Sequence, residues 1–371
     1  MKQRVVIWGG YGWGNVGDEL TLAVAVHDLR QQGVNRITIL TPTPGYTKAL
    51  FPDADVIPYR PVAPRSKWLR VLAKVCRKGL GLSLLEPALR AEMQLAKNDN
   101  WVSALQQADC LYLVGGGYFS SLFSIFDRFL LPVEVAKQHG IPVATAPLGI
   151  GPFDDKRIIK KFVNAFQGAS LVVRDETSAS FCRDLGLEVE IKRDDGFRVT
   201  EILDFNAPSC VQHKLPRLGV NFFPQHGANN TSELRNWWLE FLRIAVKSNI
   251  QVEGFCFHNQ ISEDFEAMVD LFSSAGLPAQ SVLPPVLDFR EACRNLSSYS
   301  AIVSSRFHAV VVANATGIPC LGVSSGAYYH AKMRAACEGS TKAHHIPMTE
   351  ISPFTAFELL IASRSISSIN Q

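Results

Sequence analysis

One segment of the chain places an arginine and a histidine at the join between a predicted strand and a predicted helix. The strand is Ala301–Ser304, and Arg306 and His308 follow it directly. The first backbone N–H groups of a helix have no internal partner and its dipole is positive there, so this end attracts an anion. Ser304 or Ser305 is the expected N-cap. With the arginine fork added, these groups predict a phosphate or carboxylate site.

His308 supplies something that a plain anion site does not need. Its imidazole gives and takes a proton near neutral pH, so the arginine and the histidine together suggest catalysis on an anion. These residues alone also allow a structural interpretation, in which the arginine caps a neighbouring carbonyl and the histidine is satisfied in the core.

A second arginine occupies an equivalent position in the first half of the chain. Arg174 follows the apolar run 171–173 and precedes a helix for which Asp175 is the expected N-cap. The structural alternative is an ion pair with Asp175 or Glu176. Together with Arg306, Arg174 would provide guanidinium groups from opposite domains, enough to clamp a small di- or trianion.

The first predicted strand ends in a glycine-rich turn, residues 9–19, with a literal Gly-x-Gly-x-x-Gly. This pattern is typical of dinucleotide binding. However, the second strand ends without an acidic residue for a ribose, and Asp18 and Glu19 occupy the place of the pyrophosphate. We expect Asn15 and Asp18 either to bind sugar hydroxyls or to help orient a base. A self-capped helix start after a tight turn is the structural alternative.

A second glycine cluster, Gly115–Gly117, follows the strand near residues 110–114. Glycine lets a ligand approach the backbone closely, here at Gly116, and Tyr118 or Phe119 could stack against a sugar ring. A simple strand-to-helix turn explains the glycines equally well.

The composition describes a globular protein of 371 residues, 47% hydrophobic and 19% charged, which is long enough for two domains. A net charge of +3 argues against nucleic acid binding as the main task. The N-terminus enters a strand almost at once, and no run of about 18 apolar residues occurs, so a cytoplasmic protein is expected. The eight cysteines are scattered without a Cys-x-x-Cys pair, which favours buried thiols over a disulfide frame or a metal site.

Short apolar runs alternate with helical stretches along the chain. Continuously apolar strands separated by helices predict an α/β protein with two Rossmann-like, doubly wound domains that face a cleft. A segment with two prolines interrupts the alternation, so we expect an N-terminal domain (1–205), a linker (206–217) and a C-terminal domain (218–371), whose last helix would pack back on the first domain. The predicted strands are Val5–Trp8, Arg36–Leu40, Asp109–Val114, Pro142–Ala146, Ser170–Val173, Leu218–Phe222, Ile250–Phe255, Ala301–Ser304 and Pro319–Val323.

Residues 65–79 do not fit this alternation. Trp68, Leu72 and Val75 fall on one helical face and basic residues occupy the rest, as in an amphipathic helix on an anionic membrane. A solvated, lysine-rich face of an ordinary helix is the alternative. The membrane interpretation would place the protein peripherally at the inner membrane face.

Four short motifs in series resemble those of the polysaccharide pyruvyl transferase family, and their order and spacing span most of the chain. Two of them depart from the family pattern. The family usually has Arg-Leu-His where this chain has Arg306-Phe-His308, and Asp-Pro-Ala-Phe where it has Asp194-Asp-Gly-Phe197. The motifs are Gly10-Tyr-Gly-Trp-Gly-Asn-Val-Gly-Asp-Glu19, Gly115–Gly117, Val173-Arg-Asp-Glu-Thr-Ser178 and Ser304-Ser-Arg-Phe-His308 with Gly317-Ile-Pro319.

The resemblance implies a fold similar to two-domain (GT-B type) glycosyltransferases, with phosphoenolpyruvate as donor and two hydroxyls of one sugar residue as acceptor. The product would be a cyclic pyruvate ketal in a cell-surface polysaccharide or glycoconjugate. By analogy, Arg306 with Ser305 would hold the donor phosphate or carboxylate, Arg174 its other anionic end, and His308 would be the acid/base. No cofactor or metal is implied beyond phosphoenolpyruvate as co-substrate.

Two other functions stay open at this stage. One is a sugar-nucleotide-dependent glycosyltransferase of the same two-domain type, and the other is a non-catalytic subunit that keeps the anion site. An oxidoreductase that uses the glycine loop is a weaker candidate. The expected partners are phosphoenolpyruvate and a sugar acceptor, either lipid-linked or nucleotide-linked, and the sequence leaves the oligomeric state open.

Overall fold

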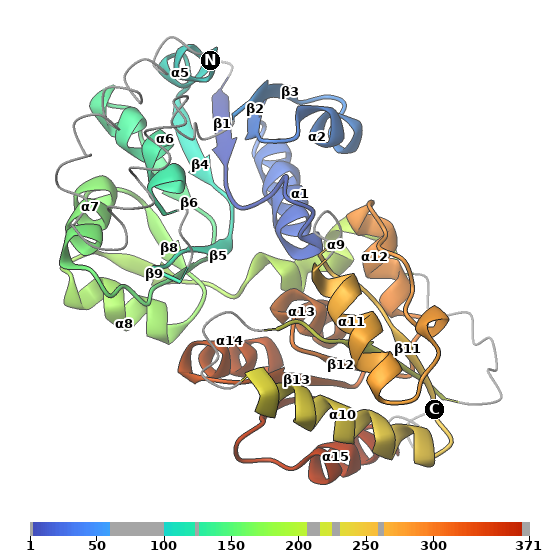
Figure 1. The fold of residues 1–371 in the computed structure, drawn as a ribbon. Coiled ribbons are helices and arrows are strands. Elements are labelled where there is room, and N and C mark those ends of the chain that lie inside the picture. Colours follow the sequence, from blue (N-terminus) through green and yellow to red (C-terminus); the bar gives the residue numbers. More distant parts are fainter. Residues whose placement is uncertain are drawn as a thin grey trace, which may run out of the picture.

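The computed structural model consists of α/β layers built on parallel sheets (Figure 1). The predicted basic segment, residues 65–79, lies outside the described residues, and so does most of the predicted linker. The described residues are 3–59, 100–122, 126–205, 216–224, 231–258 and 263–365.

The N-terminal half is built on a parallel sheet with the strand order β3-β2-β1-β4-β6. Strands β1 and β2 are buried at every position after their first residue, as expected for strands covered on both faces. The strands are β1 (Arg4–Trp8), β2 (Arg36–Thr41), β3 (Asp55–Pro58), β4 (Cys110–Leu113) and β6 (Val143–Thr145).

A smaller parallel sheet with the order β5-β7-β8-β9 adjoins the first through a bridge between Ala144 and Ser170. It carries Gly116, Gly117 and the residue before Arg174 on its strands. The strands are β5 (Gly116–Phe119), β7 (Leu148–Ile150), β8 (Leu171–Val173) and β9 (Val189–Ile191).

The C-terminal half contains a second five-stranded parallel sheet, in the order β11-β10-β12-β13-β14. Both large sheets are doubly wound, as predicted, and all nine predicted strands occur within one residue of their expected ends. The strands are β10 (Arg217–Asn221), β11 (Gln251–Gly254), β12 (Ala301–Ser304), β13 (Cys320–Ser324) and β14 (Ala343–Pro347).

Helices cover the sheets on both faces (Figure 1). Those that position the site are α1, which follows β1, α13, which follows β12, and α14, which follows β13. The helices are α1 (Val16–Gln31), α2 (Pro44–Leu50), α5 (Asn100–Gln106), α6 (Phe126–Gln138), α7 (Lys156–Phe166), α8 (Glu176–Asp184), η3 (Asp195–Arg198), α9 (Val199–Ile202), α10 (Thr231–Lys247), α11 (Glu263–Ser274), η4 (Ala279–Ser281), α12 (Phe289–Leu296), α13 (Phe307–Ala315), α14 (Ala327–Cys337) and α15 (Pro353–Ser365).

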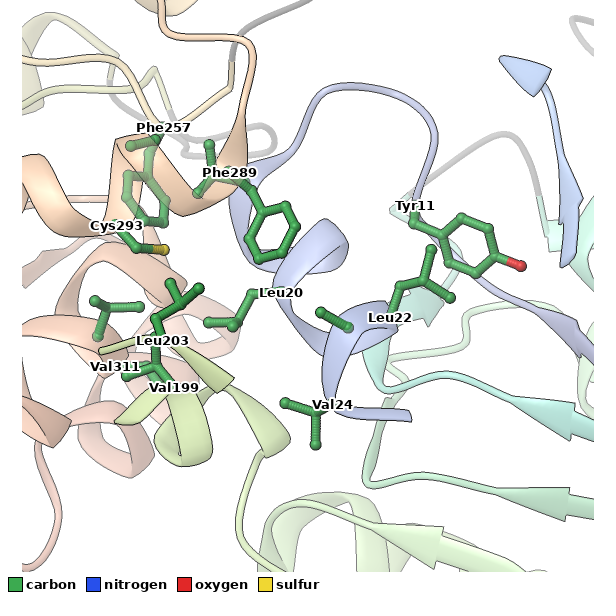
Figure 2. Close-up of a cluster of buried hydrophobic side chains, with 14 of the residues drawn as sticks. Tyr11, Leu20, Leu22, Val24, Val199, Leu203, Phe257, Phe289, Cys293 and Val311 are labelled. Carbon is green, nitrogen blue, oxygen red and sulfur yellow. The ribbon is translucent and has the colours of Figure 1, made fainter. Parts of the chain in front are cut away.

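Helix α1 is the element on which the two halves meet. It is apolar on nearly all sides because it packs on its own sheet and also on α9, α12 and α13. Figure 2 shows Leu20 pointing toward Phe289 of α12, while Leu22 lies on the side of Tyr11. One buried cluster therefore spans both halves and fixes the N-terminus of α1 against the helices of the second sheet.

The last helix stays with the second sheet. Helix α15 packs on α10 and β13, and Ala356, Phe357 and Leu360 join the hydrophobic cluster of that sheet. The sequence-based expectation that this helix returns to the first domain is wrong for its described residues. The short helices η3 and α9 contact both α1 and α13 instead, so they occupy the boundary between the halves.

Candidate active site

The polar residues singled out in the sequence gather where the strand order of each large sheet reverses. In the first sheet this point lies between β1 and β4, and in the second it lies between β10 and β12. The loops that follow these strands leave the carboxyl ends of the sheets, where doubly wound proteins bind their ligands.

Gly17 and His308 bring the two halves into contact. A Cβ built on Gly17 would lie 2.0 Å from Nδ1 of His308, so glycine is required for this approach of α1 to the imidazole. Asn15 caps α1, because its side chain accepts the N–H of Gly17 at 3.2 Å, and its backbone forms a bridge with His258 of the other half. The side chain predicted to bind sugar hydroxyls therefore has a capping role.

Asp194 joins Arg174 to His308. Its Oδ2 accepts a hydrogen bond from Nη1 of Arg174 at 3.0 Å, and its Oδ1 lies 3.6 Å from Nε2 of His308. Burial alone would raise the pKa of Asp194, but the neighbouring imidazole and guanidinium hold it well below its ordinary value. The ionised carboxylate therefore orients both partners.

Arg174 is paired through two of its three nitrogens, Nη1 with Asp194 and Nε with Asp175 at 3.8 Å, so the ion pair with Asp175 expected as the structural alternative is present. Its buried guanidinium lies 4.4 Å over the Phe307 ring, and its Nη2 has no hydrogen-bond partner among the described residues. A Cβ on Gly149 would lie 2.6 Å from Nη2, so this glycine gives the guanidinium room against β7. Because a buried donor without an acceptor is costly, Nη2 calls for an acceptor from a bound molecule.

Three hydrogen-bond donors converge over the backbone of Gly117 in β5. A Cβ built there would lie 3.0 Å from Nη2 of Arg174. The same point would lie 3.3 Å from the hydroxyl of Tyr328 and 3.6 Å from Nζ of Lys332, both on α14. An anionic oxygen near this point would bridge groups from both halves of the molecule.

Lys332 forms no hydrogen bond or ion pair with the residues that the structure describes. Its Nζ lies 5.5 Å from the ring centre of Phe307 and 5.2 Å from that of Tyr328. Burial, followed by the positive charge of Arg174, lowers the pKa of Lys332 to about 7. The amine therefore exchanges a proton near neutral pH.

Asp18 is the acidic member of this cluster. Burial raises its pKa, although the charges of His308 and Lys332 oppose the rise. The carboxylate lies beside Gly10 and Gly116, since Cβ atoms built there would lie 3.4 and 3.7 Å from its oxygens. Asp18, Gly116, Arg174 and His308, all singled out in the sequence, are thus brought together.

Arg306 is engaged within its own half. Its Nε donates to Oδ2 of the fully buried Asp264 at 3.1 Å, and its Nη2 pairs with the other carboxylate oxygen. The guanidinium also stacks 3.6 Å over the Phe223 ring. Only Nη1 is left without a partner among the described residues, so Arg306 does not present a free fork.

The two serines near Arg306 have structural partners. Ser304 accepts the N–H of Arg306 at 2.9 Å, but Arg306 itself occupies the N-cap position of α13, which has no side-chain cap. Ser305 accepts the N–H of Phe223 at 2.7 Å and donates to its carbonyl at 3.2 Å. The expected serine N-cap is therefore wrong, and Ser305 ties the end of β12 to the end of β10.

Tyr118 is part of the hydrophobic core. Its ring stacks on Phe129 at 4.4 Å, and its hydroxyl donates to the carbonyl of Val114 at 2.6 Å. Phe119 is fully buried as well. The predicted stacking surface for a sugar is thus not provided by these two rings.

The sequence analysis missed three members of the cluster. Asp194 was noted only as part of a turn, although it stands where the resemblance places the first residue of Asp-Pro-Ala-Phe. Tyr328 and Lys332 lie one helical turn apart on the helix after β13, and a tyrosine and lysine at that spacing beyond a strand end were the available signal. The expected N-cap at Asp175 is confirmed, because it accepts the N–H of Ser178 at 2.7 Å.

The glycine loop after β1 uses its own N–H groups internally. The carboxyl of Glu19 accepts the N–H of Gly12 at 2.6 Å, and burial raises the pKa of Glu19 to about 8.

Across the described ranges, no three His, Cys, Asp or Glu side chains form a group that could hold a metal ion. In the same ranges, no helix has the length and apolar character needed to cross a bilayer.

Several solved structures are similar to this chain in overall fold. A UDP-N-acetylglucosamine 2-epimerase from Neisseria meningitidis bound to UDP-GlcNAc has a TM-score of 0.57 at 11% identity, over 97% of this chain and 90% of that one. A putative UDP-N-acetylglucosamine 2-epimerase from Listeria monocytogenes has a TM-score of 0.60 at 11% identity, over 100% and 88%. A glycosyltransferase from Rickettsia africae has a TM-score of 0.53 at 11% identity, over 98% and 93%. The predicted GT-B-like fold is therefore confirmed.

A search of curated proteins gave no match. The family model for polysaccharide pyruvyl transferases matches residues 15–326, a span that runs from the cap of α1 to the start of α14. It includes Asp18, Arg174, Asp194 and His308 and thus most of the cluster described above. The chain belongs to the polysaccharide pyruvyl transferase family.

Proposed function

We propose that the protein transfers pyruvate from phosphoenolpyruvate to two hydroxyls of one sugar residue and forms a cyclic ketal. The observation that carries this proposal is the convergence of Arg174, Tyr328 and Lys332 over Gly117. Phosphoenolpyruvate bears its phosphate and its carboxylate on the same carbon, C2, so a compact cationic site with several donors suits it. A proton-exchanging cluster lies directly beside this site.

The donor would be held from both halves. We assign one anionic end to Nη2 of Arg174, the hydroxyl of Tyr328 and the amine of Lys332. The other end would face the start of α13, where Nη1 of Arg306 is available and the helix dipole is positive. Asp264 and Phe223 would fix the direction of Arg306, which refines the clamp of two arginines expected from the sequence.

His308 would act as the base for a sugar hydroxyl. Asp194 lies at its Nε2, as an orienting carboxylate does in acid/base sites, and would stabilise the imidazolium that forms. As the hydroxyl oxygen attacks C2 of the donor, the bond from C2 to the phosphate oxygen breaks. The cationic groups around Arg174 stabilise the charge that moves onto the departing phosphate.

The acceptor would bind on the side of the glycine loop after β1. Trp13 stands in this loop between Gly12 and Gly14, which have positive φ angles of 83° and 79°, and 38% of its surface is exposed. The indole thus offers an apolar platform for a sugar ring in place of the buried Tyr118. Asp18 would accept a hydrogen bond from a hydroxyl of that ring.

Phosphoenolpyruvate is a co-substrate in this proposal, and no cofactor is invoked. The acceptor sugar would belong to a cell-surface polysaccharide or glycoconjugate under assembly in the cytoplasm. The basic segment, residues 65–79, motivates a peripheral contact with an anionic membrane that would carry a lipid-linked acceptor.

The test is phosphate release by the purified protein with phosphoenolpyruvate and a panel of methyl pyranosides, nucleotide sugars and polyprenyl-linked sugars. Acceptor-dependent release, with a pyruvate ketal in the product by mass spectrometry, supports the proposal. Calorimetry with phosphoenolpyruvate alone separates the alternatives. Binding without turnover favours a non-catalytic subunit, and sugar transfer from a nucleotide sugar without phosphoenolpyruvate binding favours a glycosyltransferase.

A further inference from the structure

Lys332 differs from the other cations of the site in lacking a carboxylate partner. Arg174 has Asp194 at 3.0 Å and Arg306 has the buried Asp264, whereas Lys332 has no ion pair among the described residues and lies beside three aromatic rings. A nearby carboxylate would raise the pKa of a lysine and keep its amine charged. An amine without such a partner, beside other cations, has a lowered pKa and loses its proton more readily.

Charged groups from several elements surround the amine of Lys332. Asp18 approaches from α1 and opposes the loss of its proton, while the two arginines favour that loss. The balance holds the pKa of the amine near 7, so both protonation states are populated under neutral conditions. The charged and titratable groups that face it are Asp18, Arg174, Asp194, Arg306, Tyr328 and Tyr329.

We propose that Lys332 is the residue that protonates C3 of phosphoenolpyruvate, and that His308 deprotonates the sugar. This inference rests on the proposed function and divides between two residues the acid and base roles that the sequence assigned to His308 alone. It is carried by the position of Nζ, which lies 5.5 Å from the centre of the Phe307 ring and 3.6 Å from a Cβ built on Gly117, beside the donor site.

The division of roles balances the reaction. The ammonium of Lys332 gives its proton to C3, which becomes a methyl group, and C2 becomes electrophilic. The first sugar oxygen bonds to C2 and passes its proton to His308, while the bond from C2 to the phosphate oxygen breaks. His308 gives that proton to the departing phosphate. The second hydroxyl then closes the ring on C2, and its proton returns to the neutral amine of Lys332.

Two features separate Lys332 from the alternatives. His308 is packed on Gly17 and held by Asp194, so its imidazole belongs to the boundary with α1. Asp18 shares the region, but a carboxyl there lies among acceptor-side groups such as Gly10 and Gly116. Of the three groups that lie over Gly117, Lys332 is the one whose pKa lies near 7, since the pKa values of Arg174 and Tyr328 are raised.

The experiment compares wild type with Lys332→Arg, which keeps the positive charge but does not release its proton. With the most active acceptor of the panel, we expect Lys332→Arg to bind phosphoenolpyruvate within a few-fold of wild type by calorimetry and to lower kcat by about 10²–10⁴. Because the acid form of Lys332 is the protonated one, kcat/KM of the wild type, which reports the free enzyme, should fall as pH rises through about 7, and Lys332→Arg should lose this limb.

Chemical rescue sharpens the test. Lys332→Cys treated with 2-bromoethylamine regains an amine at nearly the same reach, and it should recover turnover, with the pH limb displaced because the thioether makes the amine more acidic. Wild type treated in the same way is the control for the other cysteines.

A Lys332→Arg enzyme with near wild-type kcat, or an unchanged pH profile, would overturn the assignment of Lys332 while leaving the proposed function intact. Failure of wild type to bind phosphoenolpyruvate would overturn both. A merely structural lysine would lower turnover without rescue by the restored amine.

Discussion

Arg174 and Arg306 occupy equivalent places in the two halves, and they differ in what they leave free. Each follows the end of an apolar strand, each stacks on a phenylalanine, and each pairs with a buried aspartate. Arg174 binds its aspartate through one nitrogen and keeps Nη2 without a partner, whereas Arg306 gives Asp264 two nitrogens.

The difference also lies in the carboxylates. Asp194 divides its charge between Arg174 and His308, so it couples an anion-binding group to an acid/base group across the two halves. Within the described part of the chain, Asp264 pairs with Arg306 alone, in the second half. We propose that the two arginines have unequal roles: Arg174 belongs to the reaction centre, and Arg306, braced by Asp264, holds the donor from beside it.

The strongest test of this comparison removes each carboxylate charge in turn. Asp194→Asn and Asp264→Asn should each destabilise the protein by about 3–5 kcal/mol, because each leaves a guanidinium without its buried partner. The cost should be smaller for Asp264→Asn, since 18% of the Arg306 side chain is exposed against 2% for Arg174. Denaturant unfolding measures both values.

Turnover should separate the same two variants. Asp194→Asn should nearly abolish phosphate release, whereas Asp264→Asn should retain most of it under conditions where both are folded. Equal losses in the two folded variants would contradict the distinction between a reaction centre and a support.

The second test concerns His308, which Asp194 links to Arg174. His308→Ala should lower turnover by about 10²–10⁴ and leave phosphoenolpyruvate affinity largely intact, because a base for the sugar acts after donor binding. Steady-state phosphate release and calorimetry measure the two quantities. Near wild-type turnover in this variant would return His308 to a packing role against Gly17.

The third test changes the guanidinium and keeps its charge. Arg174→Lys should weaken phosphoenolpyruvate binding by about 1–3 kcal/mol, because lysine loses the geometry that serves Asp194 and the ligand together. Arg306→Lys should also weaken binding, by a smaller amount in the same range, since only Nη1 is proposed to reach the donor. Calorimetry ranks the two, and the reverse order would make Arg306 the principal donor ligand.

The smallest effect is expected at Phe307, where the family usually has leucine. Its ring supports Arg174 at 4.4 Å and lies 5.5 Å from Lys332. Phe307→Leu should cost about 0.5–2 kcal/mol of stability through the lost cation–π contacts. It should also shift the basic limb of the pH profile, because the environment of Lys332 changes. An unchanged unfolding free energy would show that the ring contributes packing alone.

The positions of the strands and the family could be predicted because they depend on local patterns. Continuous apolar runs such as Val5–Trp8 and Ala301–Ser304 indicate buried parallel strands, and glycines mark the turns that follow them. The short strands β3, β5, β7, β9 and β14 were not predicted, since most of them are too short to show a period. Helix α1 was expected at the correct place, but its contact with the second half was not.

The sequence by itself determined which residues stand at strand ends: Arg174, Arg306 and His308 follow apolar runs that form strands. Only the tertiary structure decided their partners. Ion pairs depend on distances between segments far apart in the chain, such as the 3.0 Å between Arg174 and Asp194 and the 3.6 Å between Asp194 and His308. The burial that lowers the pKa of Lys332 likewise arises because α14 lies against β5, and no local sequence pattern encodes that contact.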